Sequence, residues 1–112
     1  NNKDLTINGD GQQTRTFLYV DDNVDFIMKL INSSECINDT VNIGSAEQIS
    51  IIDLAHLIKE ITGSVSKIRH VPPLAEGDMR RRQPDITKMS LVYGKDLITL
   101  RKGIEQYLET LL

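Results

Sequence analysis

Apolar residues at helical spacing mark the first predicted helix, which follows Asp21 and Asp22. Either carboxylate can cap the N-terminus of a helix. The apolar residues that follow lie at positions i, i+3, i+4 and i+7, namely Val24, Ile27, Met28 and Ile31. We expect this helix to bury its apolar face and to leave Asp25, Lys29 and Asn32 in solvent.

The strongest local signals belong to a second helix, between Ser50 and Gly63. Ser50 and Asp53 form a capping box at its start, and Gly63 can end it in a left-handed conformation. One face of the stretch between them is apolar, with Leu54, Leu57, Ile58 and Ile61. These signals predict an amphipathic helix that begins directly after Ser50.

Two more helices are predicted in the C-terminal third of the chain. Asp85 can cap a helix over residues 86–92, which Gly94 would end. The last helix follows Thr99 and carries five apolar residues on one face: Leu100, Ile104, Tyr107, Leu108 and Leu111.

Short β-prone runs separate these helices, at residues 5–7, 16–20, 40–44 and 68–71. Alternating strands and helices predict an α/β packing of layers. The strands are too few and too short to build a complete dinucleotide-binding fold. We therefore expect residues 1–112 to form a single small mixed α/β domain with about four helices.

Composition and charge argue against nucleic acid, membrane and metal as partners of this chain. The net charge is −3 and the pI about 5.3, whereas nucleic-acid-binding domains are usually basic. No apolar run is long enough to cross a membrane. Cys36 is the single cysteine and cannot form an internal disulfide, which suits a reducing cytoplasm. No metal is expected, because the simpler interpretation of His56 is a surface histidine of the second predicted helix.

A glycine-rich turn delivers one arginine into a β-prone run. Residues 9–22 read Gly-Asp-Gly-Gln-Gln-Thr-Arg-Thr-Phe-Leu-Tyr-Val-Asp-Asp. The planar guanidinium of Arg15 can make two parallel charge-assisted hydrogen bonds to a diphosphate. On chemistry alone, Arg15 can equally be a surface residue that pairs with Asp10 or Asp21.

Three consecutive arginines lie in a second motif, over residues 72–88. This stretch contains Pro72-Pro73, Gly77-Asp78 and Arg80-Arg81-Arg82, and it ends in Pro-Asp-Ile-Thr-Lys. Adjacent like charges repel one another, so a solvated loop is the simpler interpretation. The arginines become useful when a dianionic ligand lies among them.

Together the two motifs resemble the substrate-binding part of the extended short-chain dehydrogenase/reductase family, which contains nucleotide-sugar epimerases, dehydratases and decarboxylases. The first resembles the family's Gly-x-Gly…Arg-x-Phe-x-x-Val-x-Asp run, and the second its Pro-Pro…Gly-Asp-x-Arg…Pro-Asp-Ile-x-Lys segment. The resemblance covers residues 5 to about 108. It implies a small mixed α/β substrate-binding subdomain, part of a longer enzyme whose Rossmann half is absent from this chain.

The resemblance also implies the residues that bind a UDP- or dTDP-sugar. Arg15 would hold the diphosphate together with Arg80 or Arg82, Asp78 would accept hydrogen bonds from ribose hydroxyls, and Gln13 would contact the substrate. Arg80 matches the epimerase-like register and Arg82 the pattern of UDP-glucuronate decarboxylases. We therefore favour an epimerase-like or decarboxylase-like parent over a dehydratase.

Two features set this chain apart from the complete family pattern. Ala75 stands where many epimerases carry an arginine, so Arg80 or Arg82 must take over its phosphate contact. The family's catalytic Tyr-x-x-x-Lys pair and the Gly-x-Gly-x-x-Gly motif for NAD are both missing. We expect no catalytic residue in this chain and no NAD bound to it alone; NAD and the NAD-binding half would belong to the parent enzyme.

Two functions remain open at this point. The first is the nucleotide-sugar-binding half of an NAD-dependent epimerase, decarboxylase or dehydratase, which is not catalytic alone. The second is a non-catalytic protein-interaction module that keeps the fold and has lost the site. That module would bind another chain, or itself, through exposed apolar surface.

Overall fold

The computed structural model describes residues 3–34, 38–75, 77 and 79–111. Short strands alternate with four helices in the order β1 (Leu5–Asn8), β2 (Thr14–Thr16), α1 (Val20–Ile31), β3 (Gln48–Ser50), α2 (Ile51–Thr62), β4 (Ile68–Val71), α3 (Thr87–Tyr93) and α4 (Leu100–Thr110). The predicted α/β class with four helices is confirmed.

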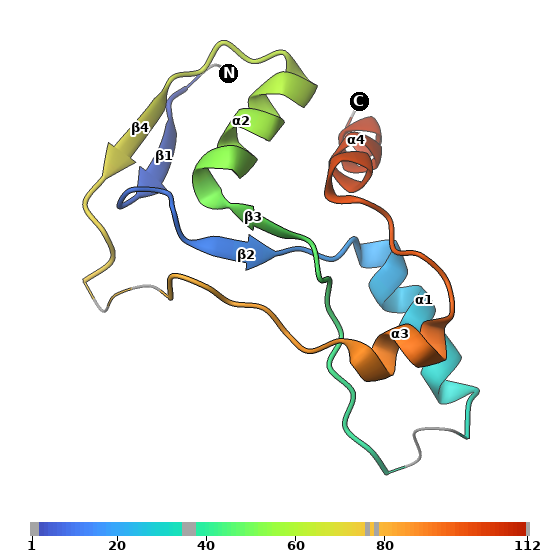
Figure 1. Cartoon of the computed structure of the whole chain (residues 1–112). Helices are drawn as coiled ribbons and strands as arrows, with labels where there is room; N and C mark the ends of the chain where they lie inside the picture. Colours follow the sequence, from blue (N-terminus) through green and yellow to red (C-terminus); the bar gives the residue numbers. More distant parts are fainter. Residues whose placement is uncertain (1–2, 35–37, 76, 78, 112) are drawn as a thin grey trace.

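The strands form two small sheets. β1 and β4 are parallel and pair from Leu5 with Ile68 to Asn8 with Val71. β2 and β3 are antiparallel, with Arg15 opposite Ile49 at the centre. In Figure 1, β1, β4 and α2 lie at one end of the molecule, α1 and α3 at the other, and β2 and β3 run between them.

The molecule is flat and open. Its principal extents are 49 × 36 × 17 Å and its radius of gyration is 16.7 Å, whereas a compact domain of about 100 residues has a radius near 13 Å. The main buried cluster contains Phe26 of α1 with Met89 and Tyr93 of α3. The rings of Phe26 and Tyr93 meet edge to face, with centroids 5.7 Å apart. This cluster fixes α1 against α3 at one end of the molecule.

The predicted strand over residues 16–20 is wrong in its position. β2 covers Thr14–Thr16, because these are the residues that pair with β3. Tyr19 has extended backbone angles and occupies the N-cap position of α1, so Val20 already belongs to the helix. Leu18 packs against the Phe26 cluster instead of continuing the strand.

The predicted strand over residues 40–44 is also wrong, because this segment belongs to neither sheet. It runs beside Pro84, which has no N–H to donate to a strand partner. A Cβ on Gly44 would lie 2.6 Å from Cγ of Pro84, so the proline ring leaves no room for a side chain at this position. Asn42 reaches across to the carbonyl oxygen of Asp85, at 3.3 Å.

Helix α1 exists as predicted, and Asp25, Lys29 and Asn32 are exposed as expected, but the expected burial of its apolar face is wrong. The apolar face that includes Ile27 and Ile31 is exposed, and the completely buried side chain is Phe26. Neither Asp21 nor Asp22 caps the helix, since both lie in its first turn. The amphipathic periodicity is present, but neighbouring segments cover the opposite side.

The signals around α2 are confirmed. The Oγ atom of Ser50 accepts a hydrogen bond from the N–H of Asp53 at 3.2 Å, and Gly63 ends the helix with φ +67°.

At α3 the cap is displaced by one residue from the predicted Asp85. Ile86 is the N-cap, while Asp85 accepts hydrogen bonds from Thr87 N and Oγ1 at 3.0 and 2.7 Å.

Thr99 caps α4 by accepting a hydrogen bond from the N–H of Lys102 at 3.3 Å. Within the described ranges, no helix has the length and apolar character needed to cross a membrane.

Candidate functional site

A turn that contains Gly9 and Gly11 packs the first motif, residues 9–22, against the start of α2. Gly9 and Gly11 have φ of +73° and +75°, a region that side-chain-bearing residues rarely adopt. The carbonyl oxygens of Gly11 and Gln13 accept hydrogen bonds from Ile52 N and Ile51 N, both at 3.0 Å. The turn is therefore fixed relative to α2, and it determines where β2 begins.

Gln13 is part of this turn. Its side chain is buried, with 6% exposed, and Nε2 donates to the carbonyl oxygen of Asn8 at 3.2 Å. This contact makes Gln13 a support of the turn in the unliganded chain. Its predicted contact with substrate stays a prediction.

Arg15 occupies the middle of β2 and is half buried. Its guanidinium donates through Nη1 to the carbonyl oxygen of Thr14 at 2.7 Å. Asp10, one of the acidic partners considered for Arg15, pairs instead with an arginine of the second motif.

The three arginines, Arg80, Arg81 and Arg82, form what we call the arginine segment, which runs parallel to β2 where it meets Thr14. The N–H of Thr14 donates to the carbonyl oxygen of Arg80 at 2.7 Å, and Thr14 forms a parallel bridge with Arg81. The two motifs are 66 residues apart in sequence, from Thr14 to Arg80. The fold thus brings the backbones of both arginine-bearing segments into direct contact.

Arg80 forms a two-pronged ion pair with Asp10. The Nη1–Oδ1 and Nη2–Oδ2 distances are 2.9 and 3.1 Å, a geometry that the planar guanidinium favours. The hydrogen bond from Arg80 lowers the pKa of Asp10 to about 2, and Asp10 in turn raises the pKa of Arg80. Both side chains are more than half exposed, so this pair can exchange with a bound anion.

The other two arginines make local contacts. Arg82 Nη2 lies 3.1 Å from Sδ of Met79, and Arg81 Nη2 donates to Oε1 of Gln83 at 3.1 Å. Arg80 and Arg81 both contact Thr14 of β2 through their backbones, whereas the family pattern names Arg80 and Arg82. In the sequence, only its place in the run of three arginines pointed to Arg81. Asp78, the predicted ribose contact, lies outside the described residues.

Asp22 has a structural role. It is buried, and its carboxylate accepts hydrogen bonds from the hydroxyl of Tyr93 at 2.9 Å and from Ile98 N at 2.7 Å. The same hydroxyl also lies 3.0 Å from Oδ2 of Asp25. Burial, followed by the two carboxylates, raises the pKa of Tyr93. Asp22 therefore ties α1 to the α3–α4 connection.

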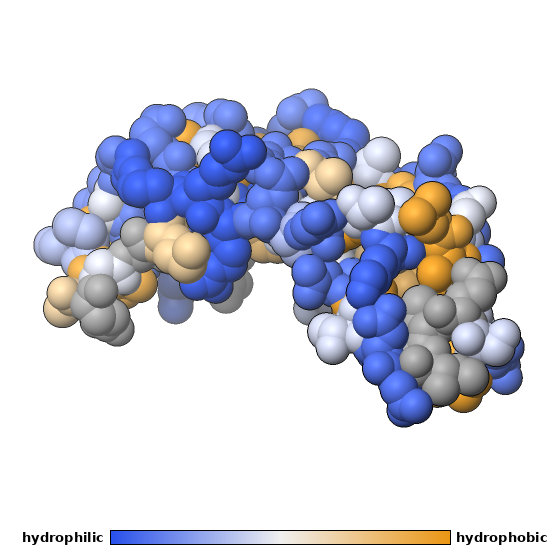
Figure 2. Space-filling model, turned by 60° about the horizontal axis from the view of Figure 1, so that its bottom comes forward, coloured by the Kyte–Doolittle hydropathy of each residue, from blue (hydrophilic) through white to orange (hydrophobic). Residues whose placement is uncertain are grey.

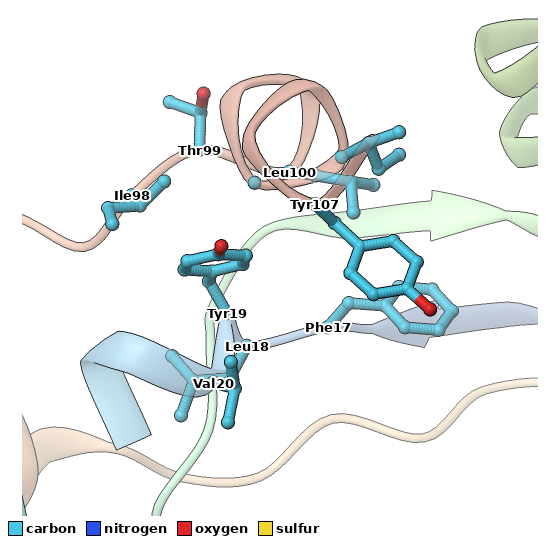
Figure 3. Close-up of a pocket in the computed structure, with 10 residues that line it drawn as sticks. Phe17, Leu18, Tyr19, Val20, Ile98, Thr99, Leu100 and Tyr107 are labelled. Carbon is cyan, nitrogen blue, oxygen red and sulfur yellow. The ribbon is translucent and has the colours of Figure 1, made fainter. Parts of the chain in front are cut away.

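An apolar groove of about 320 Å³ lies between the β2–α1 junction and α4. Figure 3 shows Tyr19 and Tyr107 extending toward the space between these two segments. Its lining contains no charged side chain: Phe17, Leu18, Tyr19, Val20, Ile98, Thr99, Leu100, Gly103, Ile104 and Tyr107. Such a surface does not suit a diphosphate. Among the described side chains, no three His, Cys, Asp or Glu residues gather in a way that could hold a metal ion.

Comparison with known proteins relates this chain to enzymes that act on nucleotide sugars. The profile of the NAD dependent epimerase/dehydratase family matches residues 1–44. UDP-glucuronic acid decarboxylase 1 of Danio rerio is 39% identical over 106 residues, which are 94% of this chain and 25% of the decarboxylase.

Two epimerases are among the solved structures that share the fold. UDP-glucuronic acid 4-epimerase from Bacillus cereus, in complex with UDP-glucuronic acid and NAD, superposes with a TM-score of 0.83 at 30% identity. UDP-glucose 4-epimerase from Thermotoga maritima, with UDP-glucose, gives 0.84 at 29% identity. In both cases the match covers 99% of this chain and 37% of the other.

The chain thus spans about a quarter of the length of the decarboxylase and little more than a third of each epimerase. The glycine turn, β2, α1 and the arginine segment all lie within the region that the structural matches cover. The chain therefore represents a partial region of the NAD-dependent epimerase/dehydratase family, with UDP-glucuronic acid decarboxylases and UDP-sugar epimerases among its homologues.

Proposed function

We propose that this chain is the nucleotide-sugar-binding subdomain of an NAD-dependent epimerase or decarboxylase, and that Arg15 and the arginine segment hold the diphosphate of its substrate. The observation that carries the proposal is the hydrogen bond from Thr14 N to Arg80 O, which places the two segments side by side. Guanidinium groups from both segments can then approach one anion.

The charged side chains beside β2 explain how a chain with a net negative charge can still bind an anion. Asp10 neutralises Arg80 in the unliganded chain, so the like-charged arginines do not face each other uncompensated. A diphosphate carries more negative charge than the single carboxylate of Asp10. Both side chains of the Asp10–Arg80 pair are exposed, so a ligand can reach them. We expect the ligand to displace Asp10 from Arg80 on binding.

The chemistry of such an enzyme would require residues that this chain does not contain. NAD belongs in the parent to a glycine-rich motif that is missing here, as is the Tyr-x-x-x-Lys pair. We infer that this subdomain contributes affinity and orientation, so that binding at the diphosphate helps to position the sugar for reaction elsewhere. With its single cysteine, it would act in a reducing cytoplasm.

UDP is the first ligand to test, because the two epimerase structures are described with UDP-glucuronic acid and UDP-glucose. Amide NMR spectra of the 112-residue chain would be recorded during a titration with UDP, and with dTDP and uridine in parallel. We expect weak binding of UDP, with shifts at Arg15 and Arg80–Arg82, and no such shifts with uridine, which lacks the diphosphate.

Arg80→Gln and Arg15→Gln should each weaken the binding of UDP. Arg101→Gln provides the matched control, because it removes the same charge from α4, where Arg101 pairs with Glu60 and Glu105. Equal weakening by all three substitutions would show a nonspecific charge effect. No amide shift at millimolar UDP would contradict the proposal.

The second function, a non-catalytic interaction module, is favoured by one observation: the outer face of α1 is apolar and exposed. Light scattering after size-exclusion chromatography separates the two functions. A chain that associates with itself and does not respond to UDP supports the module, whereas a monomer that responds to UDP supports the binding subdomain.

A further inference from the structure

The arginine segment lies along the edge of β2 that faces away from β3. On the β3 side, the carbonyl oxygen of Gln13 accepts a hydrogen bond from Ile51 N. Successive residues of a strand in an antiparallel pair direct their backbone groups to opposite edges, so those of Thr14 point to the other edge. There the N–H of Thr14 donates to the carbonyl oxygen of Arg80 at 2.7 Å.

The pairing also determines the face of the sheet on which Arg81 lies. Side chains that are paired across neighbouring strands share a face, and every second residue of one strand shares it too. Arg81 bridges to Thr14, and Gln48 of β3 pairs with Thr16, two residues further along β2. Arg81 and Gln48 therefore share one face.

The side-chain contacts of Arg81 agree with this placement. Its Nη2 donates to Oε1 of Gln83 at 3.1 Å. With its oxygen assigned to the side of the guanidinium, the Gln48 amide accepts from Nε and Nη2 of Arg81 at 3.1 and 3.2 Å. Gln83 in turn donates through Nε2 to the carbonyl oxygen of Ala46 at 3.3 Å. Two neutral amides thus connect Arg81 to β3 and to the residues that precede it.

The neighbours of Arg81 point elsewhere. Successive side chains of an extended segment alternate between faces, so Arg82 lies on the face that Arg15 occupies in β2. Arg80 reaches Asp10 of the glycine turn. Figure 2 shows mainly hydrophilic surface on the half of the molecule that contains this segment, whereas hydrophobic surface gathers on the arm formed by α1 and α3. Arg80 and Arg82 are exposed, so an anion can reach them while Arg81 keeps its amide partners.

We propose that Arg81 is a positioning residue, which holds the arginine segment against β2 and β3 so that Arg80 and Arg82 are directed to the diphosphate. The inference rests on the proposed function, and it adds a division of roles among three consecutive identical residues. A guanidinium suits this role because its planar fork of donors can serve two amide oxygens at once, whereas an ammonium is a point charge without that fork.

Hydrogen exchange of the Thr14 amide reports the position of the segment without any ligand, because this N–H donates to the carbonyl oxygen of Arg80. We expect exchange to become about fivefold faster in Arg81→Ala, as the loss of one anchoring hydrogen bond requires. Arg81→Lys keeps the charge but lacks the fork, and it should exchange as fast as Arg81→Ala. The amides of α1, at the other end of the molecule, report whether the whole chain has been destabilised.

Arg82→Ala is the matched control, because it removes the same charge from the next residue, whose printed neighbour is Met79 within the same loop. It should leave the exchange of Thr14 unchanged. Gln48→Ala removes the partner on β3 and should accelerate this exchange as Arg81→Ala does, and the double variant should be no faster than either single one. Unchanged exchange in Arg81→Ala, equal acceleration in Arg82→Ala, or additive effects in the double variant would overturn the proposal.

A titration with UDP separates this proposal from the proposed function. The side-chain Nε–H NMR signal of Arg81 should stay in place as UDP is added. A shift of this signal along the binding curve of Arg15 would make Arg81 a ligand contact and overturn its positioning role. If the chain does not respond to UDP at all, the proposed function fails, and the exchange of Thr14 still decides whether Arg81 anchors the segment.

Discussion

Replacing Tyr93 by phenylalanine isolates one hydroxyl group that orients α1. The Tyr93 side chain is 3% exposed, and its hydroxyl lies 2.9 Å from Asp22 Oδ1 and 3.0 Å from Asp25 Oδ2. The ring itself would remain in place, since phenylalanine keeps the edge-to-face contact with Phe26. Asp22 would retain the N–H of Ile98, and Asp25 would retain its ion pair with Lys95.

The expected cost follows from the loss of this one donor. A hydrogen bond to a charged group contributes about 1.5–3 kcal/mol, and a buried acceptor that loses its donor keeps its desolvation penalty. We expect Tyr93→Phe to lower the free energy of unfolding by about 2 kcal/mol. With urea slopes of about 1–3 kcal/mol per molar, the unfolding midpoint should fall by about 1 M.

Urea unfolding followed by circular dichroism measures this loss, with Tyr107→Phe as the matched control. Tyr107 is 58% exposed, and its substitution should change stability by no more than about 0.5 kcal/mol. Because the folded protein raises the pKa of Tyr93, the hydroxyl stabilises fully below the ordinary value of 10.0 and loses its effect only as pH rises above it. Equal midpoints for the two variants at pH 7 would refute the shared hydrogen bond.

Three further results follow from the structure. Gly44→Ala should destabilise by about 1–3 kcal/mol in the same urea assay, because the new Cβ would lie 2.6 Å from Cγ of Pro84. The carboxyl carbon of Asp10 should titrate in NMR near pH 2 and return toward 3.8 in Arg80→Gln, so this pair stabilises above pH 3.8 and is lost as pH falls toward 2. Asp10→Asn should tighten UDP binding in calorimetry, because it removes the carboxylate that competes for Arg80; weaker binding would mean that Asp10 serves to orient the arginine.

The parts of the fold that local signals determine could be predicted from the sequence. Ser50 caps α2 and Gly63 ends it, both by contacts within a few residues. β3 escaped prediction because residues 48–50 become a strand through pairing with β2, more than 30 residues earlier. The run at 40–44 has strand-like composition, but the neighbour that the fold gives it includes Pro84, which cannot complete a ladder.

Periodicity found the apolar stripe of α1 but not the direction in which it faces. That direction depends on Asp22 and its bonds to Tyr93 and Ile98, which are more than 70 residues away in sequence. For the candidate site, the two motifs predicted which arginines would bind the ligand and that a glycine turn would precede Arg15. The contact between Thr14 and Arg80, and the pairing of Arg80 with Asp10, depend on tertiary structure and left no local signal.

The central claim is that guanidinium groups from β2 and from the arginine segment engage the same diphosphate. Side-chain Nε–H NMR signals of the arginines, recorded with and without UDP, test it most directly. We predict that Arg15 and at least one of Arg80 and Arg82 shift together along one binding curve, while Arg101 on α4 stays unchanged. A shift confined to one segment, or no shift in either, would contradict the account.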